Sequence, residues 1–444
     1  PELCLTGYTC GDLFLQDTLL DGAERALETI LDATADRDMV IALGLPVRCR
    51  HKLYNCAAVL HRGQLLSLTP KTYLPNYGEF YEKRWFSILP PDSMGEGIAL
   101  AGRTTMLGNG MLFQDETVPG LTIGVEICED LWAAMPPSAA LAAQGATVIL
   151  NLSASDEAAG KADYRRSLVT GQSARLVCAY LYADAGEGES STDLVFTGHD
   201  MIAENGTMLA ETRFATGLTV SEIDVQRLVY ERRRLTPFPV EPECGVGLFS
   251  LNREETVLTR PVPPSPFVPA KDADRSGRCR EIFTIAALGL KKRLEHTGAK
   301  GAVIGLSGGL DSTLALLITV EAMKLLDRPM TDIFAVTMPC FGTTERTKSN
   351  AVLLAEKLGT RIQTIDISAA VRQHFADIGQ SMEDQDVTFE NAQARERTQV
   401  LMDLANQTGA LVIGTGDLSE LALGWATYNG DHMSMYAVNA SIPK

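Results

Sequence analysis

The sequence predicts two consecutive α/β domains, and three observations support this prediction. The chain has 444 residues, which is more than one hydrophobic core usually accommodates. Apolar runs of strand length alternate with helical stretches in both halves of the chain. A proline-rich segment from Thr259 to Pro269 interrupts this alternation and is typical of a semi-rigid connector. We therefore expect domains at residues 1–255 and 273–444, joined by a linker at 256–272.

The composition indicates a folded protein with an acidic surface. Hydrophobic residues make up 45% of the chain and charged residues 21%, and no apolar run is long enough to span a bilayer. The formal net charge of −17 argues against nucleic-acid binding, because affinity for phosphate backbones comes mainly from Lys and Arg. Nine cysteines without a C-x-x-C pair suggest neither a disulfide framework nor a zinc ribbon. We expect a cytoplasmic protein without a nucleic-acid or membrane partner.

The two ends of the sequence indicate a segment of a longer protein. Residue 1 is Pro1 rather than Met, and the chain stops at Lys444, shortly after a dense polar motif. We expect both ends to be truncated. A signal peptide cannot be assessed from such a start.

The first half is predicted to form a layered domain with two sheets. Its apolar runs predict strands at 39–47, 54–60, 64–68, 121–127, 146–152 and 178–183. Ala- and Leu-rich stretches predict helices at 19–35 and 133–144, the second beginning at a Pro pair where proline is tolerated. Arg62-Gly63 and Asn205-Gly206 are typical of hairpin turns.

The second half is predicted to form a doubly wound parallel sheet. Strands are expected at 301–306, 332–338, 361–367 and 410–415, each separated from the next by a helical segment. This order places the ligand of such a sheet at the carboxyl ends of its strands.

A glycine-rich turn, Ser307-Gly-Gly-Leu-Asp-Ser312, follows the first of these strands and precedes an apolar helix. Such a turn points free backbone N–H groups at a ligand, which suits phosphate, although the lysine of a Walker loop is missing. Asp311 beside a triphosphate would require a bridging cation, which indicates Mg²⁺. The alternative is that Ser307 and Asp311 only cap the helix.

Two further polar motifs belong to the same predicted sheet. Thr415 and Glu420 follow the last strand, so they are expected at the same edge as the glycine-rich turn. Asp417 and Glu420 also have the spacing of a capping box, which is an alternative explanation for the pair. Asn391 and Arg395 share one face of a predicted helix, for which a solvated charged face is the alternative.

Together these motifs resemble the S-G-G-x-D-S synthetases that cleave ATP between the α and β phosphates, and within that group the NAD synthetases. The resemblance rests on residues 307–312, 391–397, 414–424 and 425–432. It implies an ATP site made of Gly305, Leu306, Ser307, Gly308, Gly309, Leu310, Asp311, Ser312 and Thr415, with Mg²⁺ near Asp311 and Glu420. It also implies a deamido-NAD site made of Asn391, Glu420, Trp425, Ala426, Thr427 and Tyr428. Ordinary aromatic packing is the alternative for Trp425 and Tyr428.

Cys128 lies at the end of an apolar strand and at the start of an acidic turn. Most cysteines are inert buried hydrophobes. The neighbouring carboxylates, Glu126 and Glu129 among them, should raise the pKa of the thiol, so a nucleophilic role needs a nearby cation. Lys71, in a loop that follows a strand, is the candidate, and an ordinary exposed lysine is the alternative.

Pro1-Glu-Leu-Cys-Leu-Thr-Gly-Tyr8, Lys71 and Cys128, in that order, resemble the carbon–nitrogen hydrolase (nitrilase) superfamily over roughly residues 1–251. The resemblance implies an αββα sandwich, although the strand that should precede Glu2 is missing. It implies that Glu2 is the general base, that Lys71 stabilises the oxyanion and that Cys128 forms a thioester. Glu79 matches a second carboxylate that orients the site in relatives.

The resemblance extends to a glutamine site. In glutamine-dependent members of the NAD synthetase family, Tyr77, Ser155 and Lys161 would contact glutamine. Each of the three has an alternative explanation as a polar residue that structures its loop.

Both resemblances meet in one family, the glutamine-dependent NAD synthetases. This implies an ATP-dependent ligase that takes ammonia from glutamine and converts deamido-NAD to NAD, AMP and pyrophosphate, as a homo-oligomer with ammonia channelling. The alternatives are another adenylating synthetase of the S-G-G-x-D-S type, including a GMP- or asparagine-synthetase-like enzyme or a tRNA-thiolating protein, and a catalytically silent nucleotide or glutamine sensor. The sequence lacks a G-x-C-x-G elbow, an N-terminal cysteine and a basic face, and it retains Glu2, Lys71, Cys128 and Asp311.

Overall fold

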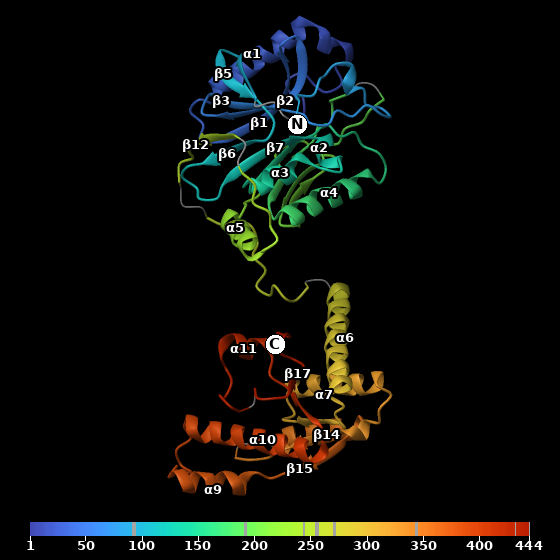
Figure 1. The fold of residues 1–444 in the computed structure, drawn as a ribbon, viewed down its shortest axis with the longest axis vertical. Coiled ribbons are helices and arrows are strands. Elements are labelled where there is room, and N and C mark those ends of the chain that lie inside the picture. Colours follow the sequence, from blue (N-terminus) through green and yellow to red (C-terminus); the bar gives the residue numbers. More distant parts are fainter. Residues whose placement is uncertain are drawn as a thin grey trace. The chain divides into compact units, whose positions relative to one another are not determined.

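The computed structural model of the chain divides into two compact units, Pro1–Pro261 and Val262–Lys444. Figure 1 shows the fold of both units. The structure describes residues 1–90, 95–190, 193–242, 245–253, 257–269, 272–341, 345–430 and 432–443. The predicted domain bounds at residues 255, 256 and 444 lie outside the described residues, as do residues 270 and 271 of the predicted linker.

The described part of the first unit contains two sheets. The five-stranded sheet has the order β1-β2-β3-β5-β4 and consists of β1 (Val40–Cys49), β2 (Lys52–His61), β3 (Gln64–Pro70), β4 (Glu96–Leu100) and β5 (Arg103–Leu107). The seven-stranded sheet has the order β11-β10-β9-β8-β7-β6-β12. It consists of β6 (Met111–Asp115), β7 (Thr122–Ile127), β8 (Val148–Leu152), β9 (Ala179–Ala183), β10 (Asp200–Glu204), β11 (Thr207–Thr212) and β12 (Gly245–Phe249).

Helices cover the outer face of each sheet. The helices of the first unit are α1 (Asp17–Ala33), α2 (Glu129–Trp132), α3 (Pro137–Ala143), α4 (Lys161–Leu176) and α5 (Val225–Arg234), with short 3-10 helices at Gly11–Leu15 and Glu82–Arg84. Leu27 and Leu31 of α1 pack on the outer face of the first sheet. Leu141 of α3 and Val169 of α4 pack on the outer face of the second.

The alternation of side chains along β2 explains the layer order. Ala58 and Leu60 point to the α1 side of the first sheet. Ala57 and Val59 point to the opposite side, where they meet Val125 of β7. Because successive side chains of a strand face opposite ways, a strand buried on both faces must lie between two packed layers. The predicted αββα sandwich is therefore confirmed.

Most of the predicted elements of the first unit are confirmed within a few residues. The β2–β3 hairpin turns at Arg62-Gly63, and the β10–β11 hairpin turns at Asn205-Gly206, with positive φ at all four residues. The helix α4 was not predicted, because its Lys, Arg, Ser and Gln residues interrupt the apolar pattern. The short strands β4, β5 and β6 were also missed, since their apolar runs are too short to stand out.

The second unit has one sheet with the order β15-β14-β13-β16-β17 among its described residues, and every strand pair in it is parallel. Its elements are α6 (Asp272–Thr297), β13 (Ala302–Gly305), α7 (Leu310–Leu325), β14 (Ile333–Thr337), α8 (Glu345–Lys357), β15 (Arg361–Thr364), α9 (Ser368–Ile378), α10 (Val387–Thr408), β16 (Leu411–Gly414), α11 (Leu418–Leu423) and β17 (Tyr436–Ala437), with a 3-10 helix at Met330–Asp332.

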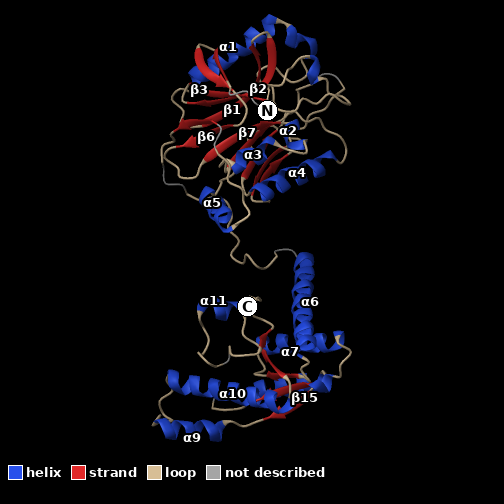
Figure 2. Ribbon diagram, in the orientation of Figure 1, coloured by secondary structure: helices blue, strands red, loops and turns tan. Residues whose placement is uncertain are grey.

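Helices lie on both faces of this sheet, as Figure 2 shows. On one face, Ile304 of β13 packs with α6 and α7, for example with Leu290. On the other face, Val303 of β13 packs with α9 and α10, for example with Phe389. The predicted doubly wound parallel sheet is confirmed. From β13 the chain adds β14 and β15 on one side of the sheet and then β16 and β17 on the other. Ligands of such folds bind at the strand ends beside the point between β13 and β16 where this order reverses.

No helix in the described ranges is both long enough and apolar enough to cross a membrane.

Candidate active site in each unit

The backbone at the beginning of the chain places Glu2 in the first unit. The Glu2 N–H donates to the carbonyl of Ser153, 3.2 Å away, and the Leu5 N–H donates to the carbonyl of Gly44, also 3.2 Å away. A Cβ atom on Gly44 would lie 2.2 Å from the Leu3 nitrogen. Only glycine therefore allows the segment to pass this closely over β1.

Glu2 belongs to a buried ion cluster with Lys71. The Lys71 Nζ lies 2.6 Å from Glu2 Oε1 and 2.6 Å from Glu82 Oε1, and each of the three side chains is no more than 2% exposed. The Asn55 Nδ2 donates to Glu2 Oε1 over 2.6 Å, and the Asn55 carbonyl accepts the Lys71 N–H over 2.8 Å. Asn55, on β2, thus contacts Glu2 through its side chain and Lys71 through its backbone.

The charges in this cluster are one cation and two carboxylates. Burial disfavours the charged form of Lys71, but Glu2 and Glu82 outweigh that effect and hold its pKa well above the usual value. Burial also raises the pKa of Glu82 to about 7, against the opposing effect of Lys71. Lys71 is therefore an ammonium, and Glu82 takes up a proton near neutral pH.

Cys128 follows β7 in a conformation that a residue with a side chain rarely adopts, with φ 44° and ψ −98°. Its N–H donates to Asn151 Oδ1 over 3.2 Å. Burial raises the pKa of the Cys128 thiol and the charge of Glu2 raises it further, whereas Lys71 and a hydrogen bond from the Ala154 backbone lower it. The thiol is therefore protonated at rest and lies within the field of both Glu2 and Lys71.

The second carboxylate of the cluster is Glu82 rather than Glu79. Glu79 is exposed, whereas Glu82 is buried, contacts Lys71 and accepts a hydrogen bond from the Tyr8 hydroxyl over 2.8 Å. Sequence reasoning missed Glu82 because it lies three residues after Glu79 in the same loop, and only burial distinguishes the two. The structure thus places Glu79 outside the buried cluster and Glu82 inside it.

The residues predicted to contact glutamine lie on three different segments of the chain. Lys161 begins α4, its Nζ is 2.5 Å from Asp156 Oδ1, and it lies 5.8 Å from the centre of the Phe80 ring. The Tyr77 ring packs against Phe80 with 6.0 Å between centres, so the structure brings Tyr77 and Lys161 to the same aromatic side chain. Ser155 is buried elsewhere on its loop, and its hydroxyl accepts a hydrogen bond from Arg165 over 3.0 Å.

The Tyr77 hydroxyl also has an acidic partner next to Cys128. It donates to Glu129 Oε1 over 2.8 Å, and Glu129 directly follows Cys128 in the chain. The Tyr77 side chain is 59% exposed, so it stands where a solute could reach it.

The second unit has a cavity of about 570 Å³ at the carboxyl ends of β13, β14 and β16. This volume is in the range of small-molecule sites. The residues that line the cavity come from these strand ends, from the turns that follow them, from α7, α10 and α11, and from the segment after α11: Gly305, Leu306, Ser307, Asp311, Ser312, Thr337, Met338, Phe341, Glu390, Gln393, Arg397, Thr398, Leu401, Val412, Ile413, Gly414, Thr415, Gly416, Glu420 and Met433.

The glycine-rich turn borders this cavity. Gly305, Leu306, Ser307, Asp311, Ser312 and Thr415 of the predicted ATP residues belong to the lining. Gly308, Gly309 and Leu310 complete the same turn without belonging to that lining, and Gly308 has φ 81°. The Ser307 hydroxyl accepts the Gly309 N–H over 3.2 Å, so part of the turn is also held by its own side chains. Sequence reasoning missed the lining residues at the end of β14.

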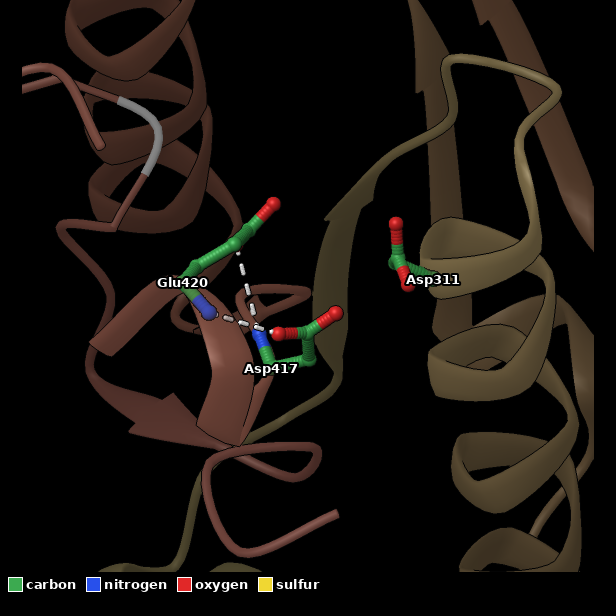
Figure 3. Close-up of side chains that lie close together, drawn as sticks. All are labelled: Asp311, Asp417 and Glu420. Carbon is green, nitrogen blue, oxygen red and sulfur yellow. Dashed lines mark hydrogen bonds between the residues drawn. The ribbon is translucent and has the colours of Figure 1, made fainter. Parts of the chain in front are cut away.

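Three carboxylates gather beside the turn. Ligand oxygens of Asp311, Asp417 and Glu420 all lie within 4.8 Å of one another. Figure 3 shows Asp311 at the start of α7 opposite the other two side chains. Asp417 also caps α11: it accepts the Glu420 N–H over 2.8 Å, while Glu420 Oε2 accepts the Asp417 N–H over 3.3 Å. The capping box considered as the alternative is therefore present in the structure. The side chains of Asp417 and Glu420 that form it also face Asp311.

Of the residues predicted to bind deamido-NAD, Asn391 lies in α10 and Glu420 in α11, while Trp425 to Tyr428 lie on a loop tied to α10. The Thr427 hydroxyl donates to Asn391 Oδ1 over 2.8 Å, and the Arg395 Nε donates to the Tyr428 carbonyl over 3.1 Å. Ala426 lies on the same exposed loop. Trp425 is 81% exposed and Tyr428 is 79% exposed, so neither ring is part of the core. Of this set, only Glu420 lines the cavity in the described residues.

Comparison with known families assigns each unit. Residues 1–233 match the carbon-nitrogen hydrolase family, and residues 282–441 match the NAD synthase family.

Known proteins match the whole chain. A glutamine-dependent NAD(+) synthetase of Mycobacterium tuberculosis is 45% identical over 462 residues, covering 100% of this chain and 68% of the relative. The protein of the same name from Mycobacterium leprae is 44% identical over 469 residues, with the same coverage. A crystal structure of a glutamine-dependent NAD(+) synthetase from Cytophaga hutchinsonii is 25% identical with a TM-score of 0.44, and the match covers 100% of this chain and 72% of that one.

Proposed function

The chain belongs to the glutamine-dependent NAD(+) synthetases, and on this premise we propose which of its residues carry out each half of the reaction. The family assignment makes the chain an ATP-using ligase that forms the amide of NAD with nitrogen from glutamine. The proposal is that the first unit releases ammonia at Cys128 and that the second unit activates deamido-NAD at the cavity beside the glycine-rich turn.

The glutaminase half requires a base, a nucleophile and an oxyanion partner. Glu2 takes the proton of the Cys128 thiol as the sulfur attacks the amide carbon of glutamine. The Lys71 ammonium stabilises the negative charge that develops on the carbonyl oxygen. Glu2 then gives the proton to the departing nitrogen, ammonia leaves, and water cleaves the thioester. The Lys71–Glu2 contact of 2.6 Å beside the thiol is the observation that carries this assignment.

Glu82 replaces Glu79 as the second carboxylate in this proposal. Its contact with Lys71 and its hydrogen bond from Tyr8 give the ammonium a second fixed partner besides Glu2. Without it, Lys71 would contact Glu2 alone and lose part of the support that holds its position.

Tyr77, Ser155 and Lys161 are proposed to contact glutamine. Lys161 offers a cation for the α-carboxylate of an amino-acid substrate, although it is paired with Asp156 in this structure. Ser155 offers a hydroxyl whose position is set by Arg165. The support is the placement of Tyr77 and Lys161 against one ring, that of Phe80.

The ATP site is proposed at the cavity of the second unit, with Gly305 to Ser312 and Thr415 as its binding residues. A glycine-rich turn before the 16-residue helix α7 provides N–H groups and the positive end of the helix dipole to phosphate. The apolar side chains of Met338, Phe341 and Leu401 line the same cavity and suit a nucleobase.

Mg²⁺ is proposed at Asp311 and Glu420, with Asp417 as a third carboxylate. Oxygen ligands from three carboxylates within 4.8 Å of one another are the donor set that this hard cation prefers. When bound, the cation would neutralise charge between these carboxylates and the phosphates. Asp311, at the start of α7, holds its carboxylate toward that position.

Deamido-NAD is proposed to bind at Asn391, Glu420 and the segment from Trp425 to Tyr428. The tie of Thr427 to Asn391 keeps this segment against α10, which also lines the cavity. The exposed rings of Trp425 and Tyr428 offer flat surfaces on which a pyridine or purine ring can stack.

Three broader expectations stay proposals. They are the domain bounds 1–255 and 273–444, a cytoplasmic homo-oligomer, and channelling of ammonia from one half-reaction to the other.

Product analysis with labelled substrate tests this function. The full chain is incubated with ATP, deamido-NAD and glutamine that carries ¹⁵N in its amide group. We expect NAD with one ¹⁵N atom, AMP and pyrophosphate in equal amounts. Unlabelled NAD, or ADP in place of AMP, would contradict the proposal.

A further inference from the structure

We propose that Asp130 is a positioning residue of the glutaminase half, because its carboxylate ties the segment that carries Lys71 to the turn that carries Cys128. The inference rests on the proposed roles of these two residues. Lys71 directly follows β3, and Cys128 directly follows β7. These strands belong to two different sheets, so the hydrogen-bond ladder of neither sheet sets the distance between the two side chains.

Asp130 makes contacts with the backbone on both sides. Its Oδ1 accepts the Tyr73 N–H over 2.8 Å and the Thr72 N–H over 3.1 Å. Its Oδ2 accepts the Ile127 N–H over 2.9 Å. Thr72 and Tyr73 directly follow the lysine, and Ile127 directly precedes the cysteine. One side chain therefore fixes the two catalytic segments at the residues next to their reactive groups.

The burial of Asp130 makes this connection hard to replace. The residue is only 1% exposed, so water does not reach the three N–H groups that it satisfies. Cys128 also has a strained backbone, and strained residues persist where their surroundings hold them in place. An asparagine at this position would turn an NH₂ group toward an N–H donor on one side, which would release either the Lys71 segment or the Cys128 turn.

Asp115 provides a matched control in the same unit. It is 4% exposed and accepts N–H groups from Thr117 over 2.6 Å, Val118 over 2.7 Å and Leu251 over 3.2 Å. These contacts also join separate backbone segments, but they involve no proposed catalytic or glutamine residue. A loss that is merely structural should appear in both variants, whereas a loss of positioning should appear only in Asp130→Asn.

The experiment compares Asp130→Asn and Asp115→Asn in the full chain. Glutamine-driven and ammonia-driven NAD synthesis are measured, together with alkylation of the Cys128 peptide by iodoacetamide at a series of pH values. We expect kcat with glutamine to fall on the order of 100-fold in Asp130→Asn with KM for glutamine little changed, since small misplacements cost about this much. Ammonia-driven synthesis should remain.

The pH profile of alkylation distinguishes positioning from stability, because a merely structural role of Asp130 would leave the pH midpoint unchanged. In Asp130→Asn, the thiol of Cys128 is displaced relative to the charges of Lys71 and Glu2, so the pH midpoint for alkylation of Cys128 should shift. Asp115→Asn should keep the midpoint of the unsubstituted chain, and its kcat with glutamine should stay within about twofold of that chain, in the range of ordinary substitutions away from a site.

The inference is overturned if Asp130→Asn keeps its kcat, or if it loses no more than Asp115→Asn with an unchanged alkylation midpoint. Should Asp130→Asn also lose ammonia-driven synthesis, Asp130→Glu carries the test, since it keeps both oxygens but displaces them by one methylene. It should lower kcat at constant KM, and an unchanged kcat would overturn the inference. Failure of the proposed function looks different, since Cys128→Ala would then retain glutamine-driven synthesis.

Discussion

Cys128 differs from a core cysteine in two ways at the residue scale. Its positive φ turns the side chain out of the line of β7, and the charges of Glu2 and Lys71 both act on its thiol. A cysteine that only packs in the core requires neither a positive φ nor charged neighbours. The resemblance to the nitrilase-type site, carried by the order of Glu2, Lys71 and Cys128, implied that these two charges would lie near the thiol.

Glu82 shows where this kind of prediction stops. Glu79 and Glu82 are separated by only three positions in the sequence, and both follow Lys71. The tertiary fold buries one and exposes the other, and no local pattern encodes that difference. The hydrogen bond from Asn55 to Glu2 could not be predicted either. It depends on the pairing of strands that are distant from the N-terminus in the sequence.

The correction from Glu79 to Glu82 predicts a difference between two similar variants. Glu82→Gln should lower glutamine-driven synthesis on the order of 100-fold, because Lys71 loses the carboxyl partner that holds its ammonium in position. Glu79→Gln, at an exposed position, should leave the rate nearly unchanged. Initial rates with saturating glutamine test this. Equal losses in the two variants would contradict the assignment.

The pKa of Glu82 predicts a dependence of stability on pH. A carboxyl group with a folded pKa of about 7 and an ordinary pKa near 4.5 when unfolded binds its proton more tightly in the folded state. Its contribution is fully present below pH about 4.5 and is lost as pH rises through about 7, with a size on the order of a few kcal/mol. Glu82→Gln cannot lose that proton.

The measurement is urea unfolding of the unsubstituted chain and of Glu82→Gln at pH 5 and pH 8. The free energy of unfolding of the unsubstituted chain should fall more between these pH values than that of the variant. The comparison cancels the effect of Asp184, whose pKa burial also raises to about 7. An equal fall in both proteins would show that Glu82 is ionised in the folded state throughout this range.

At the scale of elements, the passage of the N-terminal segment over β1 is the arrangement that brings Glu2 to Lys71. Gly44→Ala would place a Cβ atom 2.2 Å from the Leu3 nitrogen and displace this segment. We expect a loss of glutamine-driven synthesis of at least about 100-fold, because Glu2 moves with the segment. Ammonia-driven synthesis should persist.

Gly97→Ala is the matched control, since it lies on β4 of the same sheet with no atom within 4 Å of the new Cβ position. It should leave both rates near those of the unsubstituted chain. If Gly44→Ala behaved like Gly97→Ala in assays with glutamine and with ammonia, the close approach at β1 would not matter for the site.

The elements themselves were predictable where burial is strong. The strands β2 and β13, buried along most of their length, stand out as apolar runs, and the hairpin turns follow from Arg62-Gly63 and Asn205-Gly206. The helix α4 was not predictable in this way, because it buries Arg165 and Gln172 as well as apolar residues. Buried polar side chains interrupt the periodic pattern of apolar residues on which such predictions depend. Their hydrogen-bond partners come together only in the folded protein.

At the scale of the whole molecule, each unit has its own core and its own candidate site. The glycine-rich turn and the strand order predicted the position of the second site, because the ligand edge of a doubly wound sheet follows from its topology. The place of Asp417 beside Asp311 did not follow, since its capping role already explained its presence at the start of α11. Two separate sites in one chain imply that each half-reaction can be removed without the other.

The most direct test compares the variants Cys128→Ala and Asp311→Ala in three assays. These assays measure glutamine hydrolysis, glutamine-driven NAD synthesis and ammonia-driven NAD synthesis. Cys128→Ala should lose the first two by about 10⁴-fold or more and keep the third, because it lacks only the sulfur nucleophile. Asp311→Ala should lose both kinds of synthesis and keep glutamine hydrolysis. Glutamine-driven synthesis that survives in Cys128→Ala, or ammonia-driven synthesis that survives in Asp311→Ala, would contradict the account.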